Sequence, residues 1–201
     1  MKSVLFPVII LATFLASCTK PEFEKITESI PLDQRAANAF DFCINNDYNK
    51  DYCILVDMSI HSGKKRLYLW DFNENKVIES YLVSHGCCKN QWSEDETRNS
   101  PRFSNIEDSH CSSLGKYRVG KRGWSSFGVN INYRLHGLEP SNSNAFERNI
   151  VFHSWDKIGD EETYPAGTPE GWGCPAVSDK AFLAIDPYLK KATNPTLLWI
   201  Y

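Results

Sequence analysis

Three β-prone runs follow one another between residues 53 and 84, and they restrict the fold more than any other feature of the chain. Apolar, β-branched and aromatic residues dominate residues 53–60, 66–72 and 76–84. Polar, turn-forming segments separate the runs, such as His61-Ser62-Gly63-Lys64-Lys65. Runs of this length with short polar joints are typical of antiparallel strands. The sequence therefore predicts a β-meander within a mainly β domain.

The rest of the chain predicts further strands and two marginal helices. Strand-like segments return at residues 116–120, 133–138, 149–153 and 196–201, while apolar residues at helical spacing occupy residues 32–46 and 178–191. The polar segment 86–112 predicts a long functional loop. Residues 32–201 suit one domain with a substantial core. A net charge of −3 gives no reason to expect nucleic acid as a partner.

The N-terminus has the order of a secretory signal. Lys2 precedes an apolar run at residues 4–16, which is too short to span a bilayer. The ending Leu15-Ala16-Ser17-Cys18 resembles the bacterial lipobox, in which the cysteine becomes the lipidated first residue. The alternative is an ordinary signal cut near Ala16, with Cys18 incidental. We expect a signal peptide at residues 1–17, a tether at 18–31, and a location in the bacterial cell envelope, facing the periplasm and anchored to a membrane through Cys18.

A histidine and a cysteine near the C-terminus stand in a chemically suggestive setting. His153 ends the apolar run Asn149-Ile150-Val151-Phe152, and Cys174 lies in the turn Gly171-Trp172-Gly173. A base, a nucleophile and a run of backbone N–H groups are the parts of a cysteine acyl-transfer site. The alternatives are a surface histidine at a strand end and a buried or disulfide-bonded cysteine.

The other cysteines have no unique assignment. Apart from Cys18 and Cys174, the sequence contains five cysteines, namely Cys43, Cys53, Cys87, Cys88 and Cys111. Disulfides persist in exported proteins, and Cys43 with Cys53, and Cys87 or Cys88 with Cys111, are candidate pairs by sequence distance. A zinc site built from His85, Cys87, Cys88, His110 and Cys111 is conceivable, but no CxxC spacing supports it. We expect no metal and no cofactor.

Four blocks of sequence resemble the L,D-transpeptidase catalytic domain, in its YkuD-like murein branch. They are residues 83–86, residues 103–105 with 112–117, residues 137–139 with 145–151, and His153 with residues 172–177. They occur in the family's order across roughly residues 50–201. The resemblance implies a β-sandwich-like fold with a few marginal helices and peptidoglycan stem peptides as the substrate.

The resemblance also implies roles for particular residues. Cys174 would be the nucleophile and His153 the base, oriented by the Ser154 carbonyl or by Asp156. Gly173, with Cys174, would offer backbone N–H groups to an oxyanion, although the same residues are also expected of a simple tight turn.

Two further residues are candidates for substrate contact. We expect His85 to line the site or to donate to a substrate carboxylate, with a solvated strand-end histidine as the alternative. Trp172 would form one wall of the groove, unless it packs in the core. Arg148 is expected to form a structural ion pair, with substrate contact as the alternative, because strand parity puts it on the face opposite His153. Family members often carry Ser or Thr where this chain has Gly171.

The implied activity has competitors. The first hypothesis is a transpeptidase that forms 3→3 cross-links through a thioester on a tetrapeptide stem. An L,D-carboxypeptidase or endopeptidase would use the same residues with water as acceptor. A third alternative is a non-catalytic lipoprotein that binds the cell wall. An unrelated cysteine peptidase is disfavoured, because papain-like enzymes place the cysteine before the histidine, the reverse of the order here.

Overall fold

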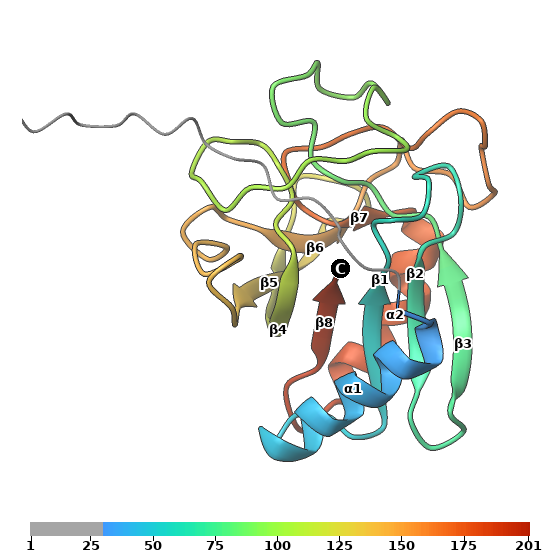
Figure 1. Cartoon of the computed structure of the whole chain (residues 1–201), viewed down its shortest axis with the longest axis vertical. Coiled ribbons are helices and arrows are strands. Elements are labelled where there is room, and N and C mark those ends of the chain that lie inside the picture. Colours follow the sequence, from blue (N-terminus) through green and yellow to red (C-terminus); the bar gives the residue numbers. More distant parts are fainter. Residues whose placement is uncertain (1–29) are drawn as a thin grey trace, which may run out of the picture.

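The computed structural model describes residues 30–201, whose strands form one eight-stranded sheet that curls almost into a barrel (Figure 1). The order across the sheet is β3-β2-β1-β8-β4-β5-β6-β7. The strands are β1 (Tyr52–Val56), β2 (Leu67–Asp71), β3 (Lys76–Tyr81), β4 (Gly115–Trp124), β5 (Ile131–Gly137), β6 (Val151–Ser154), β7 (Ala176–Val177) and β8 (Leu197–Ile200). The predicted mainly β fold is confirmed, and the two halves of the expected sandwich are parts of one continuous sheet.

The predicted meander of β1, β2 and β3 is present, with both pairs antiparallel. Asp71 organises the turn between β2 and β3, because its carboxylate accepts hydrogen bonds from the backbone N–H groups of Asn73 at 2.8 Å and Glu74 at 3.0 Å. A side chain that satisfies two turn amides stabilises a tight reversal. The long segment between β3 and β4 contains no strand, as its polar composition predicts.

The strand nearest the C-terminus lies in the middle of the sheet. β8 pairs parallel with β1 and antiparallel with β4, so it joins the meander to the second half of the sheet (Figure 1). The two ends of the sheet, at β3 and β7, are also linked directly. Ser84, after β3, is hydrogen-bonded to Ala176 of β7, and Gly86 forms a β-bridge with Gly171. The segments that follow β3 and precede β7 therefore meet at a seam.

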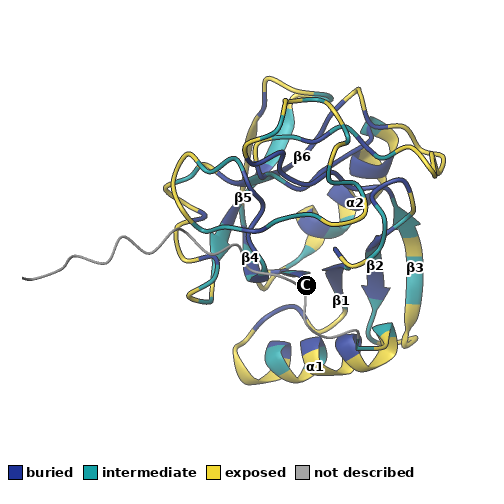
Figure 2. Ribbon diagram, turned by 45° about the horizontal axis from the view of Figure 1, so that its top comes forward, coloured by how far each residue is buried: buried dark blue, intermediate teal, exposed yellow. Residues whose placement is uncertain are grey.

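Two helices cover opposite sides of the sheet. α1 (Leu32–Asn45) lies along one side of the sheet (Figures 1 and 2). Its residues Ala36, Ala39 and Cys43 are buried against Cys53 and Leu55 of β1. The alternate β1 residues Ile54 and Val56 face the main core instead. Successive strand side chains point to opposite faces, which explains why a strand between two apolar layers reads as a continuous apolar run.

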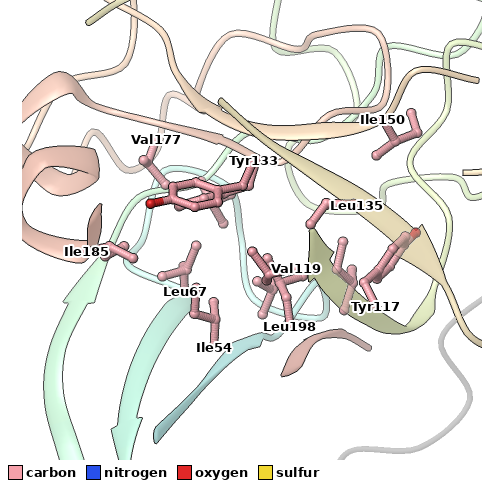
Figure 3. Close-up of a cluster of buried hydrophobic side chains, with 14 of the residues drawn as sticks. Ile54, Leu67, Tyr117, Val119, Tyr133, Leu135, Ile150, Val177, Ile185 and Leu198 are labelled. Carbon is pink, nitrogen blue, oxygen red and sulfur yellow. The ribbon is translucent and has the colours of Figure 1, made fainter. Parts of the chain in front are cut away.

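The main core fills the interior of the curled sheet. Ile54, Val119, Leu135 and Leu198 come from four strands and meet Ile185 of α2 (Asp179–Lys191) (Figure 3). Burying a side chain of this size contributes about 1.5–3 kcal/mol. The sequence predicted both helices to within about a residue at their ends, and α2 begins where the Ser178 hydroxyl accepts the N–H of Ala181 at 3.1 Å, a common N-cap arrangement.

The cysteines are only partly paired. Cys88 and Cys111 form a disulfide across the long loop, one of the two pairings considered for this region. Cys43 and Cys53, the other candidate pair, are separate buried thiols in the cluster under α1. Cys87 is also a buried free thiol. The expected signal peptide, Cys18 and nearly all of the tether lie outside the described residues, and within residues 30–201 no helix has the length and apolarity to cross a membrane.

Candidate active site

The parallel pair of β6 and β7 brings the predicted histidine to the predicted cysteine loop. His153 is in register with Ala176, two residues after Cys174, and the two-residue strand β7 is an element that the sequence did not predict. Its brevity explains this, since two residues carry no periodicity. Both His153 and Cys174 line one cavity of about 130 Å³.

His153 is held in one orientation by its own strand. The side chain is only 7% exposed, and its Nδ1 lies 2.8 Å from the carbonyl oxygen of Ser154. A carbonyl can only accept, so Nδ1 carries the proton and Nε2 keeps a free lone pair in the neutral ring. Of the two orienting groups considered from sequence, the Ser154 carbonyl is the one in contact. The Ser154 hydroxyl accepts the N–H of Val129 at 2.9 Å and so braces the turn between β4 and β5.

That turn carries an aromatic ring to the histidine. Gly128 has φ +53°, and a Cβ there would lie 2.0 Å from the Ser154 hydroxyl oxygen, so only glycine permits this approach. The neighbouring Phe127 ring then lies 5.4 Å from the His153 ring, centroid to centroid. Phe127 is part of the cavity wall. The turn therefore limits how far the imidazole can move.

The Cys174 thiol has few polar neighbours. Its Sγ accepts the backbone N–H of Val151 at 3.4 Å and lies 3.9 Å from the carbonyl oxygen of Asn149, and no hydrogen bond to His153 is found within residues 30–201. Burial raises the pKa of the thiol, although the Val151 N–H and the charges of Arg148 and Arg134 act in the opposite direction. Burial also lowers the pKa of His153, against its bond to Ser154. The resting pair is therefore a neutral thiol and a neutral imidazole.

The backbone around Cys174 leaves donors free. Gly173 has φ +99°, and its carbonyl accepts a hydrogen bond from the Ser112 hydroxyl at 3.1 Å, which fixes the turn. The N–H groups of Gly173 and Cys174 have no acceptor within the described part of the chain. Unpaired amides beside a nucleophile can donate to an oxyanion as it forms.

The remaining wall of the cavity is aromatic. Trp172, expected as a groove wall, lines the cavity and is 60% exposed. Its ring stacks on His110 at 4.9 Å between centroids and lies 6.3 Å from the ring of Trp92, which in turn stacks on Trp155 at 5.4 Å. No motif in the sequence marks Trp92, Phe127 or Trp155 as cavity residues. Only one feature of the sequence could have indicated a role in the cavity. Trp92 and Phe127 lie in polar segments, where a large aromatic side chain is not expected to be part of the core.

His85 lies outside the cavity. It is fully buried, with Nδ1 2.8 Å from an Arg66 nitrogen and Nε2 2.8 Å from the Thr97 hydroxyl. That hydroxyl donates to Glu170 at 2.8 Å. Arginine can only donate, so His85 accepts at Nδ1 and is the neutral link between two buried charges. Its backbone carbonyl accepts the N–H of Gly171, so His85 supports the cysteine loop from behind, and neither the expected substrate contact nor a solvated position describes it.

The missing hydroxyl at Gly171 leaves open space. Gly171 lines the cavity, and a Cβ at this position would meet no atom within 4 Å. The site therefore has room for the side chain that relatives often carry. The chain around the nucleophile tolerates its absence because Ser112 and Ser84 bind the loop, at the carbonyls of Gly173 and Cys174 respectively.

The chain is similar to known proteins in sequence and in structure. The sequence model of the L,D-transpeptidase catalytic domain matches residues 28–201. Similar solved structures include an L,D-transpeptidase from Xylanimonas cellulosilytica, at 13% identity and a TM-score of 0.39, covering 80% of this chain and 68% of that one. The helical cell shape determining protein Pgp2 from Campylobacter jejuni has 12% identity and a TM-score of 0.42, with 80% and 54% covered.

A third structure, an Ldtfm–avibactam carbamoyl enzyme, has 11% identity and a TM-score of 0.43. It is covered over 49% of its length, against 76% of this chain, so the chain spans about half the length of this structure and of Pgp2. A comparison with curated protein sequences found no match. The family match covers the entire sheet, both helices and the cavity with His153 and Cys174. The chain therefore belongs to the L,D-transpeptidase catalytic domain family, whose members modify peptidoglycan.

Proposed function

We propose that this protein is an L,D-transpeptidase that forms 3→3 cross-links between peptidoglycan stem peptides through a thioester on Cys174. The observation that carries the proposal is the bond from His153 Nδ1 to the Ser154 carbonyl, which leaves Nε2 free as a base in the cavity that Cys174 also lines. Members of the family act in the cell wall or periplasm, where such stems occur.

In the acylation step, Cys174 Sγ attacks the carbonyl between the third stem residue and the terminal D-Ala. Its proton passes to His153 Nε2 as the carbon–sulfur bond forms. The tetrahedral oxyanion accepts hydrogen bonds from the N–H groups of Gly173 and Cys174; one such donor lowers a barrier by about 3 kcal/mol. The carbon–nitrogen bond then breaks, and His153 returns the proton to the departing D-Ala amine.

In the second step, an amine of a neighbouring stem attacks the thioester. His153 takes a proton from that amine, the new carbon–nitrogen bond forms, and the carbon–sulfur bond breaks. The thiolate of Cys174 leaves and regains the proton from His153. Trp172, Phe127 and Trp155 line the cavity of this reaction with apolar surface.

Incubation of the full-length protein with disaccharide-tetrapeptide, followed by mass spectrometry, tests the proposal. A cross-linked dimer with release of D-Ala is the expected product. If tripeptide is the only product, the protein is instead a hydrolase, an L,D-carboxypeptidase or endopeptidase. No turnover by the wild type, together with no covalent carbapenem adduct on Cys174, would contradict both and leave a non-catalytic role in binding the cell wall.

We also propose that Cys18 carries a lipid and anchors the protein to a membrane of the cell envelope, with residues 1–17 as the signal peptide and residues 18–31 as the tether. The sequence Leu15-Ala16-Ser17-Cys18 supports this. Labelling cells with a radioactive fatty acid should mark the wild type and leave Cys18→Ser unmarked. Equal labelling of both proteins would exclude this cysteine as the attachment point.

A further inference from the structure

Arg148 lies against the cysteine loop and not on the far face of β6. The strand begins only at Val151, and Asn149 has φ +57°, so the backbone reverses between Arg148 and the strand. Parity along a strand cannot be extended through a left-handed residue, and for this reason the sequence-based placement of Arg148 was wrong. The guanidinium extends toward the segment that precedes β4.

The guanidinium binds neutral oxygens. Nη1 donates to the Ser104 carbonyl at 2.9 Å and contacts the Ser113 hydroxyl at 3.4 Å. Nη2 donates to the Cys111 carbonyl at 2.5 Å and contacts the Ser109 hydroxyl at 3.3 Å. The ion pair expected from the sequence is not present within residues 30–201, where no carboxylate lies within salt-bridge distance of Arg148.

The same group borders the peptide that leads to the nucleophile. A Cβ on Gly173 would lie 3.3 Å from Arg148 Nη2 and 2.5 Å from the Cys111 carbonyl oxygen. A half-buried charge without a counter-ion is costly, because the protein replaces only part of its hydration. A cysteine thiolate is the anion that would balance this charge during the reaction.

We propose that Arg148 is a positioning residue of the acyl-transfer reaction, holding the segment 104–113 beneath Gly173 and placing a permanent positive charge beside the Cys174 thiolate. The part of this proposal that concerns acyl transfer by the Cys174 thiolate rests on the proposed function. The charge itself is a property of the resting protein, since a guanidinium remains protonated at every working pH.

The other groups around the thiol make Arg148 the cation that matters most. Burial raises the Cys174 pKa, and among the neighbouring charges Arg148 opposes this more than Arg134 does. Arg134 donates to Asn149 Oδ1 at 2.7 Å at the surface and lies over the Phe146 ring, so water and salt screen its charge. His153 is neutral at rest.

Tyr117, on β4, is the remaining titratable group that senses Cys174. Its hydroxyl is hydrogen-bonded at Ser113, and burial raises its pKa to about 12, so it carries no charge in the working range. Among the described residues, the thiolate is thus near the half-buried cation of Arg148, the screened cation of Arg134 and the neutral imidazole of His153.

The test is the pH dependence of Cys174 alkylation by iodoacetamide, measured by peptide mass spectrometry so that the buried thiols Cys43, Cys53 and Cys87 do not interfere. Arg148→Gln should move the alkylation midpoint upward by about one pH unit, because a neighbouring arginine lowers the pKa of an acid by about 1–3 units. Arg148→Lys keeps the charge and should recover about half of that shift.

Arg134→Gln is the matched control, since it removes the same charge from a side chain whose hydrogen bond to Asn149 lies at the surface. Its shift should be smaller than that of Arg148→Gln and should disappear at 1 M salt, where the Debye length is about 3 Å. Ser109→Ala keeps the arginine but removes one of its contacts, and should leave the midpoint unchanged.

A wild-type midpoint in Arg148→Gln would overturn the proposal, as would equal shifts in Arg148→Gln and Arg148→Lys, which indicate a purely structural role. If Arg148→Gln does not fold, Arg148→Lys and Ser109→Ala still test the proposal. A shift of a full pH unit in the alkylation midpoint of Arg148→Lys, which keeps the charge, would contradict it. Alkylation needs no stem peptide, so failure of the cross-linking assay leaves this result intact.

Discussion

The carbonyl oxygen of Cys111 lies 2.5 Å from the point that a Cβ on Gly173 would occupy. Backbone of the disulfide-bonded loop is thus in direct contact with the backbone that presents the nucleophile. Since Cys111 also accepts from Arg148, the loop, the arginine and the cysteine turn form one packed unit.

Gly173→Ala should disable this unit. Alanine would be strained at φ +99° and would collide with a backbone oxygen that has no freedom to rotate away. We expect a loss of about 2 kcal/mol or more in the free energy of unfolding and at least about a 100-fold fall in kcat. Gly171→Ala is the control, because its Cβ meets no atom within 4 Å and the free energy of unfolding should stay within about 0.5 kcal/mol of wild type. Equal stabilities of the two variants, measured by urea unfolding, would contradict the packing argument.

The acid limb of the pH–rate profile should report His153. The base acts only when its ring is neutral, so kcat/KM rises as the pH increases through its pKa. Burial lowers this pKa, and the limb should therefore lie below the ordinary value of about 6.5. His153→Gln should remove the limb and reduce kcat by about 10²–10⁴-fold. A limb that persists in that variant would assign the titration to another group.

Stability should fall in mild acid because of His85. Its pKa is lowered to about 4, chiefly by burial, whereas the unfolded chain has the ordinary value near 6.5. The unfolded state binds more protons between these values, so the free energy of unfolding decreases as the pH falls from 6.5 toward 4, by up to about 3 kcal/mol. Urea unfolding across this range measures the slope.

His85→Gln provides the comparison for that slope. Its amide can accept from Arg66 and donate to Thr97 as the ring does, but it does not titrate. The variant should have a flatter profile than wild type. An unchanged slope would mean that other groups cause the loss of stability in acid. His153 is one such group, because its pKa is also lowered in the folded protein.

Reduction of the Cys88–Cys111 disulfide should weaken both stability and catalysis. The bond closes a loop with a sequence separation of 23, for which the chain-entropy estimate is about 3 kcal/mol. Catalysis should fall as well, because Cys111 supports Gly173 and binds Arg148. Paired Cys88→Ala and Cys111→Ala replacements should reproduce the effect of reductant, whereas Cys87→Ala should respond to reductant as wild type does. Full activity in the double variant would show that the loop needs no cross-link.

Much of the fold could be predicted from local patterns. The meander and both helices follow from runs and spacings that each element carries by itself. The central position of β8 could not be predicted this way, because residues 196–201 indicate a strand but contain nothing that selects β1 and β4 as its neighbours. The two-residue β7 is defined only by its pairing with β6.

The residues of the candidate site also differ in how well local sequence predicts them. His153, Cys174 and Trp172 lie in one cavity, and their identification came from motifs that keep them close in sequence. His85 was expected at the substrate because a strand-end histidine in a polar setting is indistinguishable, in sequence, from one that binds Arg66 and Thr97 in the interior. Arg148 was misplaced by one left-handed residue, which a parity argument cannot detect.

The seam between the two ends of the sheet makes the cavity a late product of folding. Ser84, which follows β3, and Ala176, on β7, both line the cavity and are hydrogen-bonded to each other, whereas in the strand order β8 joins their halves of the sheet. A chain that emerges N-terminus first, from a ribosome or a translocation channel, can pair β1–β3 and β4–β6 early. The strand that joins these two groups, β8, can pair with both only when residue 200 is free. His153 and Cys174, which the β6–β7 pair brings together without β8, can therefore meet before the side of the cavity that Ser84 lines is in place.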